Sequence, residues 1–419
     1  MSEVRVVRFN STTLTLVPES EKRKNESLFS DPDFGLFYGL CFIISIMTFI
    51  MDLSMHCWLA YVYHTRNDLF YFLLTATFII IPSIVSTGFS MRWYILDEDD
   101  EQSPAKPSLM KWSIRICTLL LQVTQIHRYF DALMYGLRSS VAGYRKQRVK
   151  QDYLYRKMLD EDCDAALLRL FYCVLNSAPQ SVLQLTILLL YKMHEADISD
   201  NYEKVTSVDK SSYHVFEYQC VSVSISIFSV AWSLTTYDRT VRFIREDKNR
   251  LSCVGTVLNF LSHFTWTVSR VFALAVFTTL YPRLALLGLG LHSTLMSAWL
   301  LYKQEVNHNR CDECVLDCML GIAYIFIFIS SHSGPQRYSY YSYYLICFAE
   351  NICCLFVWYQ NRSRSNNQLY YALIVIQISS FFLSLFFLLL YYKCFHPNRK
   401  YIVTQQFEMT ETKGDKSSC

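Results

Sequence analysis

Long apolar stretches recur along the chain, and several carry polar residues at helical spacing. Ten of them are long enough to matter in a membrane: 37–61, 69–91, 112–136, 165–192, 214–237, 251–281, 284–302, 314–331, 339–360 and 368–394. A helix needs about 20 apolar residues to cross the hydrocarbon core of a bilayer. Because a spanning segment must satisfy its own backbone hydrogen bonds in lipid, the pattern predicts an all-α, polytopic membrane helix bundle.

The remaining segments are short and polar. The first 36 residues contain charged side chains and no apolar run of the kind found in a cleavable signal peptide. The chain becomes polar again after Pro397. We therefore expect a head over 1–36, a transmembrane domain over 37–397 and a tail over 398–419, with the first apolar stretch acting as its own insertion signal.

Lysine and arginine gather in the head, in the connector 137–164 and in the connector after position 237. Such clusters face the cytosol, so both termini are predicted to be cytosolic. If 37–61 and 69–91 both span, the basic connector can reach the cytosol only when 112–136 enters and returns on the same side. With 284–302 predicted as a second segment of this kind, about eight transmembrane helices and two re-entrant half-helices result.

Polar residues follow one face of the fourth and fifth stretches. In the fourth stretch, spacings of 7, 4 and 4 from Arg169 to Gln184 place four residues on a single helix face. In the fifth, spacings of 4 and 3 place three serines on one face, beginning at Ser222. Such stripes suit the passage of a polar group along the flank of the bundle, although serine stripes also serve close helix packing. The candidate path residues are Arg169, Asn176, Gln180, Gln184, Ser226 and Ser229. Pro179 should kink the fourth helix.

Charged residues also occur within the apolar stretches, where each is costly unless paired. Those that we assign to structural pairing are Asp52, Arg128, Arg270 and Glu350. Asp52 or Glu350 would neutralise an arginine and hold the bundle together. The sequence leaves open whether these charged residues also take part directly in a polar path.

Composition narrows the class of protein further. The 419 residues are 52% hydrophobic and only 18% charged, against about 25% in soluble domains, and the net charge is +3. These values exclude a disordered chain and a nucleic-acid partner. No nucleophile elbow, phosphate loop or zinc-protease motif occurs, so we expect no enzyme activity and no cofactor. Cys311, Cys314 and Cys318 are closely spaced but lack a paired second half, so we predict no metal site.

Five motifs, in order, resemble the XK-related family of membrane proteins. They are QIHRYFDALMYGL at 125–137, NSAPQSVLQLTI at 176–187, SRVFALAVF at 269–277, AEN at 349–351 and YKCFHP at 392–397. Asp52 also falls where the family keeps an acidic residue. The resemblance covers roughly 37–397 and implies eight spans with two membrane-inserted half-helices.

The resemblance implies ATP-independent phospholipid scrambling at the plasma membrane, which exposes phosphatidylserine on apoptotic cells. In the family's best-known members a caspase first removes a terminal tail. The candidate cleavage positions here are Asp100, in the acidic connector, and Asp415, in the tail. The partners implied are membrane phospholipids, a caspase, a single-span accessory protein or a bridge-like lipid-transfer protein.

Three other readings stay open. The chain could be a non-scrambling scaffold that recruits a lipid-transfer protein through the basic connector 137–164. It could be a multi-span chemoreceptor or channel, although that class lacks the motifs quoted above. A solute transporter is disfavoured because Pro82, Pro179 and Pro282 do not form matching breaks in two halves of the chain.

Overall fold

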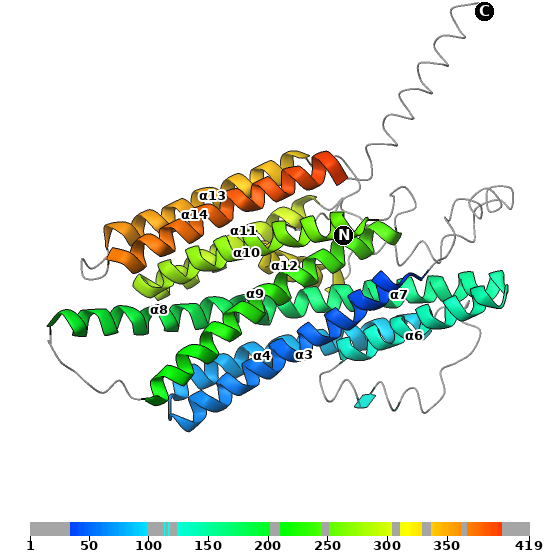
Figure 1. Cartoon of the computed structure of the whole chain (residues 1–419), viewed down its shortest axis with the longest axis horizontal. Helices are drawn as coiled ribbons and strands as arrows, with labels where there is room; N and C mark the ends of the chain where they lie inside the picture. The colour runs from blue at the N-terminus through cyan, green and yellow to red at the C-terminus, as the bar shows by residue number, and fades with distance from the viewer. Residues whose placement is uncertain are drawn as a thin grey trace, which may run out of the picture.

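The computed structural model describes residues 34–98, 113, 116–117, 124–201, 210–244, 251–303, 311–328, 337–361 and 367–395. Within these ranges the backbone is helical and contains no strand. The elements are α3 (Leu36–Thr65), α4 (Leu69–Glu98), α6 (Thr124–Tyr144), α7 (Arg148–Tyr172), η2 (Cys173–Ser177), α8 (Ala178–Asn201), α9 (Lys210–Ile244), α10 (Cys253–Leu280), α11 (Pro282–Lys303), α12 (Cys311–Ala323), α13 (Arg337–Gln360), α14 (Asn367–Leu390) and η3 (Tyr391–Phe395). Figure 1 shows the long helices lying side by side in an elongated bundle.

In the described part of the chain, eight helices are long and apolar enough to cross a membrane. They cover Leu36–Thr65, Leu69–Trp93, Arg148–Met193, Val215–Arg242, Cys253–Leu280, Pro282–Tyr302, Tyr340–Gln360 and Tyr371–Cys394. The outer helices expose large apolar side chains, such as Leu286 and Leu287 of α11, which are 71% and 70% exposed. The prediction of an all-α polytopic membrane bundle is therefore confirmed.

The second short element is not the one that the sequence predicted. Segment 284–302 belongs to α11, whose 22 residues extend about 33 Å and are long enough to span. The short element is α12, with 13 residues followed by a turn and by two residues without regular structure, up to Phe328. The prediction failed because both segments are similarly apolar in sequence. They differ in length, since α12 ends at Ala323 after 13 residues while α11 continues for 22.

The basic connector 137–164 was predicted to be a polar link, but it is helical almost throughout. α6 continues to Tyr144, the chain turns at Lys146 with a positive φ of 58°, and α7 begins at Arg148. The two helices pack against each other as an antiparallel hairpin. Part of the predicted re-entrant segment 112–136 lies outside the described residues; its described portion from Thr124 begins α6, which is not one of the candidate spans.

α7, η2 and α8 form one long helical rod through the centre of the bundle (Figure 1). The π-helical turn η2 ends two residues before Pro179, whose ring has no N–H to continue the α-helical ladder. A wider turn accommodates the proline without ending the helix, and such turns are frequent at functional sites. The predicted irregularity at Pro179 therefore takes the form of a π-helical turn.

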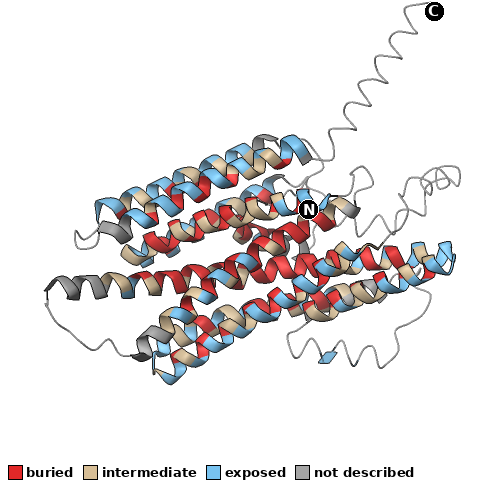
Figure 2. Cartoon of the chain, in the orientation of Figure 1, coloured by how far each residue is buried: buried red, intermediate tan, exposed pale blue. Residues whose placement is uncertain are grey.

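Buried residues are concentrated in the centre of the bundle, along α7, α8, α9 and α10 (Figure 2). In the apolar windows of the three central spans 61%, 67% and 61% of residues are buried, whereas the other five range from 17% to 33%. The outer helices face lipid with apolar side chains, while the inner helices face one another. Any polar residue on an inner helix must find its partner inside the protein.

Candidate functional site

Asp52, near the middle of α3, joins three elements. Its fully buried carboxylate accepts hydrogen bonds from the hydroxyls of Ser177 in η2, at 2.5 Å, and Ser226 in α9, at 2.9 Å. His56 lies with Nε2 2.9 Å from the Ser226 oxygen and 3.5 Å from the carboxylate. Because the Ser226 proton is directed to Asp52, the histidine fits as the tautomer protonated on Nε2. The partners of Asp52 are thus hydroxyls and a histidine.

Arg169 enters the same interior from the end of α7. Its Nη2 donates to Ser229 at 2.6 Å and to Thr48 at 3.4 Å, and the guanidinium lies 5.0 Å from the centre of the Phe49 ring. Nε and Nη1 have no hydrogen-bond partner among the described residues. A guanidinium stays charged when buried, and unused buried donors are costly. Arg169 therefore retains capacity for a further oxygen ligand.

Two amides continue this face along the rod. Asn176 donates to the hydroxyl of Tyr172 at 2.5 Å, while its own Oδ1 has no partner in the described ranges. Gln180, one turn further on, is fully buried, and neither of its amide atoms is hydrogen-bonded within the part of the chain described. Both amides are therefore positioned to bind a polar group that is not supplied by their neighbours.

A tyrosine closes the far end of the same face. Tyr63 of α3 donates to the Gln184 oxygen at 2.5 Å and accepts from Gln219 of α9 at 2.9 Å. These three side chains are buried. They connect α3, α8 and α9 near the end at which α3 finishes.

A charged pair occupies the opposite end. Asp162 of α7 lies 3.6 Å from Arg239 of α9 and accepts a hydrogen bond from Thr240 at 3.0 Å. Both charged side chains are buried, and the guanidinium lies 5.4 Å from the ring centre of Tyr38. The Asp162 Oδ1 atom and the Arg239 Nε atom have no hydrogen-bond partner in the described residues.

Together we call these buried groups in the interior of the bundle the polar column. Its members are Asp52, His56, Tyr63, Asp162, Arg169, Asn176, Ser177, Gln180, Gln184, Gln219, Ser222, Ser226, Ser229 and Arg239. From Asp162 to Gln184 the rod rises by about 33 Å, which matches the roughly 30 Å hydrocarbon core. Buried polar groups thus extend along the bundle over a distance comparable to the membrane.

The six candidate path residues all belong to the polar column, but they do not lie on the flank of the bundle. Arg169, Asn176, Gln180, Gln184, Ser226 and Ser229 are each 0% exposed. The prediction of a flank position was wrong because periodicity shows which residues share a face, and not whether lipid or another helix covers it. Here α3 packs against α9, and α8 packs against α9, so the two stripes face inward.

Arg128 is bound elsewhere, between α6, α4 and α7. It lies 2.7 Å from Asp164 and 3.2 Å from Glu161, and its Nε donates to Ser90 at 3.2 Å. The sequence predicted Asp52 or Glu350 as counter-charges for the arginines; for Arg128 the counter-charges are instead these two residues of α7. The neighbouring Tyr129 is buried, and burial raises the pKa of its phenol, so it stays neutral.

Arg270 of α10 meets Glu350 of α13, which is one of the pairs that the sequence suggested. Its Nη2 donates to the Glu350 carboxylate and its Nη1 donates to Asn351 at 2.8 Å. His292 of α11 lies 2.7 Å from the other Glu350 oxygen. The carboxylate is thus shared by two helices, α10 and α11, although its own side chain remains 35% exposed.

The same side chains hold the end of α12. Arg270 Nε donates to the carbonyl of Ile325 at 2.8 Å, and Trp266 donates to that of Phe326 at 2.8 Å. His292 Nε2 lies 3.1 Å from the carbonyl of Tyr324. These carbonyls belong to the turn that follows α12, and the helix's own last carbonyls accept from backbone N–H groups of that turn. The three side chains therefore hold the turn in place inside the bundle.

Several of these residues were not predicted from sequence. Tyr63 lies seven positions after His56, so the periodicity of α3 could have assigned it to the polar face. Asp162 and Arg239 were hidden within segments treated as polar connectors. His292 is the one histidine of a long apolar helix, and nothing local indicates that it binds a carboxylate two helices away.

The chemistry of the polar column is that of hydrogen bonding. No group of three histidine, cysteine, aspartate or glutamate side chains is placed to hold a metal ion in the residues for which the structure gives side chains. The side chains of Cys311 and Cys314 fall outside that set. Amide, hydroxyl and guanidinium groups, many with unused capacity, offer binding to a phosphate or another polar group.

A bundle of eight candidate spans, with a short element that ends inside it and a buried polar column, defines a polytopic α-helical membrane protein. The family model for the XK-related protein matches residues 40–397. The chain therefore belongs to the XK-related family.

Two relatives are both named cell death abnormality protein 8. The protein from Caenorhabditis briggsae is 24% identical over 376 residues, which cover 86% of this chain and 78% of that protein. The protein from Caenorhabditis elegans is 25% identical over 347 residues, which cover 80% and 73% respectively. The similarity extends over most of both relatives.

Proposed function

We propose that this protein is an ATP-independent phospholipid scramblase of the plasma membrane that acts in cell death. The observation that carries the proposal is the polar column, in which Arg169, Asn176 and Gln180 have unused hydrogen-bonding atoms within the described residues. A lipid headgroup cannot cross the hydrocarbon core unaided because its polar groups would lose their hydration. Membership of the family and the names of the relatives support the same activity.

In the proposed mechanism the bundle opens beside α3 or α9 and admits a headgroup to the polar column. Arg169 contacts the phosphate, and the amides of Asn176, Gln180 and Gln184 exchange hydrogen bonds with the headgroup as it moves. Asp52 keeps α3, η2 and α9 in register through its two serine donors. The acyl chains remain in the lipid, so no covalent step and no cofactor are needed, and the protein is not an enzyme.

The test is a vesicle assay with the purified full chain. Fluorescent phospholipid in the inner leaflet is protected from dithionite unless it is moved to the outer leaflet. We expect reconstituted protein to remove this protection, either as isolated or after cleavage by an effector caspase. Persistent protection under both conditions would rule out scrambling as an intrinsic activity.

Cleavage would act on segments that the structure does not describe. The candidate positions, Asp100 and Asp415, both lie outside the described residues, as do the head before Phe34 and the tail after Phe395. We propose that both termini face the cytosol, where a caspase would reach them. Sizing the fragments produced by an effector caspase from the wild-type chain, from Asp100→Ala and from Asp415→Ala assigns the site.

A second candidate function rests on the α6–α7 hairpin. Its tip exposes Tyr144 and Val149, at 93% and 87%, next to the exposed cations Arg145, Lys146 and Arg148. An exposed apolar and basic tip suits docking of a partner. As a scaffold the chain would recruit a bridge-like lipid-transfer protein or a single-span accessory protein there. On this function the purified chain would not scramble lipid in vesicles, and replacing Tyr144 and Val149 by serine would abolish partner capture.

A further inference from the structure

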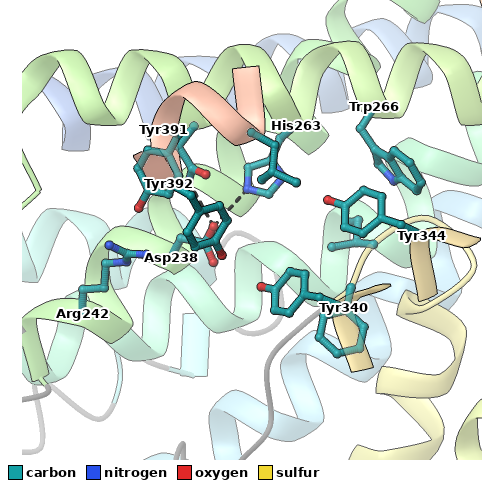
Figure 3. Close-up of a pocket in the computed structure, with 12 residues that line it drawn as sticks. Asp238, Arg242, His263, Trp266, Tyr340, Tyr344, Tyr391 and Tyr392 are labelled. Carbon is teal, nitrogen blue, oxygen red and sulfur yellow. Dashed lines mark hydrogen bonds and ion pairs between the residues drawn. The ribbon is translucent and has the colours of Figure 1, made fainter. Parts of the chain in front are cut away.

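A second polar site lies outside the polar column, among α9, α10, α13 and α14. It is a cavity of about 50 Å³, shown in Figure 3. Its lining combines a carboxylate, a guanidinium and a histidine with six aromatic rings. The residues are Asp238, Arg242, Asn259, His263, Trp266, Ile327, Phe328, Tyr340, Tyr344, Leu388, Tyr391 and Tyr392.

The cavity lies where three candidate spans end together. One span ends at Arg242, another begins at Tyr340, and a third ends at Cys394, just beyond Tyr391 and Tyr392. Span ends mark the boundary between hydrocarbon and headgroups, where tyrosine is enriched. The cavity is therefore at the depth at which lipid headgroups lie.

Asp238 is held in place but keeps a free acceptor. Asn259 donates to its Oδ2 at 3.0 Å, and His263 Nε2 lies 2.9 Å from the same oxygen. Oδ1 makes no hydrogen bond with the described residues, and the side chain is 39% exposed. Figure 3 shows a dashed line between the Asp238 carboxylate and His263, with labelled tyrosine side chains around the cavity. A fixed carboxylate with one open oxygen suits a cation.

The aromatic rings supply the rest of a cation site. Tyr344 lies 4.5 Å from Trp266 and 6.3 Å from Tyr340, between ring centroids, and Phe328 lies 4.5 Å from Tyr340. Ring faces attract ammonium groups, and clusters of aromatic rings with a carboxylate recognise substituted ammonium ions. The cavity is large enough for a few water molecules, and so for one such group rather than a whole lipid.

Arg242 adds a complementary charge one helical turn after Asp238. Its guanidinium lies 5.3 Å from the Tyr391 ring centre, and its buried Nη1 has no hydrogen-bond partner in the described part of the chain. Arginine binds phosphate oxygens with its planar donors. A carboxylate and a guanidinium on one helix face, bordered by aromatic rings, match a ligand with ammonium and phosphate a few atoms apart.

We propose that this cavity binds the ammonium end of a zwitterionic phosphodiester, such as a phosphocholine or phosphoethanolamine headgroup. Asp238 and the rings around Tyr344 hold the ammonium, and Arg242 holds the phosphate. The ligand remains bound at the membrane boundary and does not need to cross. Binding and vesicle scrambling can therefore succeed or fail independently.

Native mass spectrometry of the detergent-purified full chain tests the proposal. The probes are short-chain phosphatidylcholine, phosphatidylethanolamine and phosphatidylglycerol, the last of which lacks the ammonium. We expect the two zwitterionic lipids to bind about tenfold more tightly than phosphatidylglycerol, in line with one desolvated cation–π and ion-pair contact. Asp238→Asn, which keeps the shape and the acceptor, should remove this preference.

Asp131→Asn is the matched control, because Asp131 also pairs with a histidine, His127 at 3.6 Å, but on α6 and away from the cavity. It should leave the preference unchanged. Tyr344→Phe, which keeps the ring, should bind like wild type, while Tyr344→Leu should weaken phosphatidylcholine binding about fivefold. Thermal melting of each variant confirms that it is folded.

Soluble glycerophosphocholine distinguishes the two sources of the headgroup. If it displaces phosphatidylcholine, the headgroup alone is recognised; if it does not while Asp238→Asn still abolishes the preference, the ligand is a membrane lipid. Equal binding of phosphatidylglycerol and phosphatidylcholine to wild type, or an unchanged preference in folded Asp238→Asn, would overturn the proposal.

Discussion

Gln180 shows at the scale of one residue how the polar column differs from a packed core. A buried amide normally finds a partner, and one that does not costs about 1–3 kcal/mol. Gln180 is fully buried, and both of its amide atoms lack a hydrogen bond in the described residues. A protein that keeps such a group at this cost is expected to use it.

Gln180→Leu should therefore stabilise the protein and impair its function. The leucine removes an unsatisfied amide at similar volume, so the free energy of unfolding should rise by about 1 kcal/mol. The rate of scrambling in vesicles should fall if the amide contacts the headgroup. Gln184→Leu should lower stability, because the Tyr63 hydroxyl loses the acceptor of its proton.

Thr75→Val is the control for that experiment. Thr75 of α4 is also fully buried with an unpartnered hydroxyl in the described ranges, but it lies outside the polar column. Valine there should give a similar gain in stability with unchanged scrambling. Normal scrambling by Gln180→Leu would argue against the polar column as the lipid path.

Arg270 is buried and makes three hydrogen bonds, to Glu350, Asn351 and the Ile325 carbonyl. Arg270→Met should lower the free energy of unfolding by about 3 kcal/mol, since it removes the guanidinium from the Glu350 carboxylate and leaves the Asn351 and Ile325 oxygens without their donor. The double variant Arg270→Met with Glu350→Gln should recover part of that loss. Thermal melting in detergent measures both, and Arg283→Met, on an exposed residue of α11, should melt like wild type.

At the scale of elements, the packing of α12 against α11 depends on one glycine. A Cβ added at Gly321 would lie 1.9 Å from the Ser297 hydroxyl and 2.9 Å from the Ser293 carbonyl oxygen. α12 approaches α11 this closely because residue 321 has no side chain. Small residues serve the same purpose in other membrane helix pairs.

Gly321→Ala should therefore push α12 away from α11 and lower the free energy of unfolding by about 1–3 kcal/mol. Adding Ser297→Gly should restore part of the stability, because the closest contact is removed. Gly288→Ala, where a Cβ meets nothing within 4 Å, should be neutral or slightly stabilising. Equal melting temperatures for Gly321→Ala and Gly288→Ala would contradict this account of the packing.

The elements also show what the sequence reveals and what it does not. Runs such as those of α3 and α14 are apolar enough for their existence and approximate limits to be predicted. The interior position of Gln180 and Ser226 was not predictable, because the spacing of polar residues in a helix is the same whether that face meets lipid, water or another helix. The place of α12 was missed since the turn after it is held by donors from Trp266, Arg270 and His292, which are distant in sequence.

At the scale of the whole molecule, the eight candidate spans and a returning α12 fix the side on which each connection lies. If both termini are cytosolic, Arg283 and Asn361 lie outside and Tyr302 lies inside. Single cysteines at these three exposed positions, in a background without other exposed cysteines, would report this with a membrane-impermeant thiol reagent. We expect labelling at 283 and 361 on intact cells, and at 302 only after permeabilisation. If α12 crossed the membrane, position 361 would require permeabilisation too.

The three carbonyls at the end of α12 also constrain the order in which the protein is made. All three of their donors, on α10 and α11, are synthesised before α12, but the carboxylate that orients two of them, Arg270 and His292, is Glu350 of α13. A nascent chain that ends before α13 therefore presents a half-helix whose supports are not yet fixed. Stable insertion of α12 must wait for α13, so the last third of the chain is expected to assemble as a single cooperative step during biogenesis.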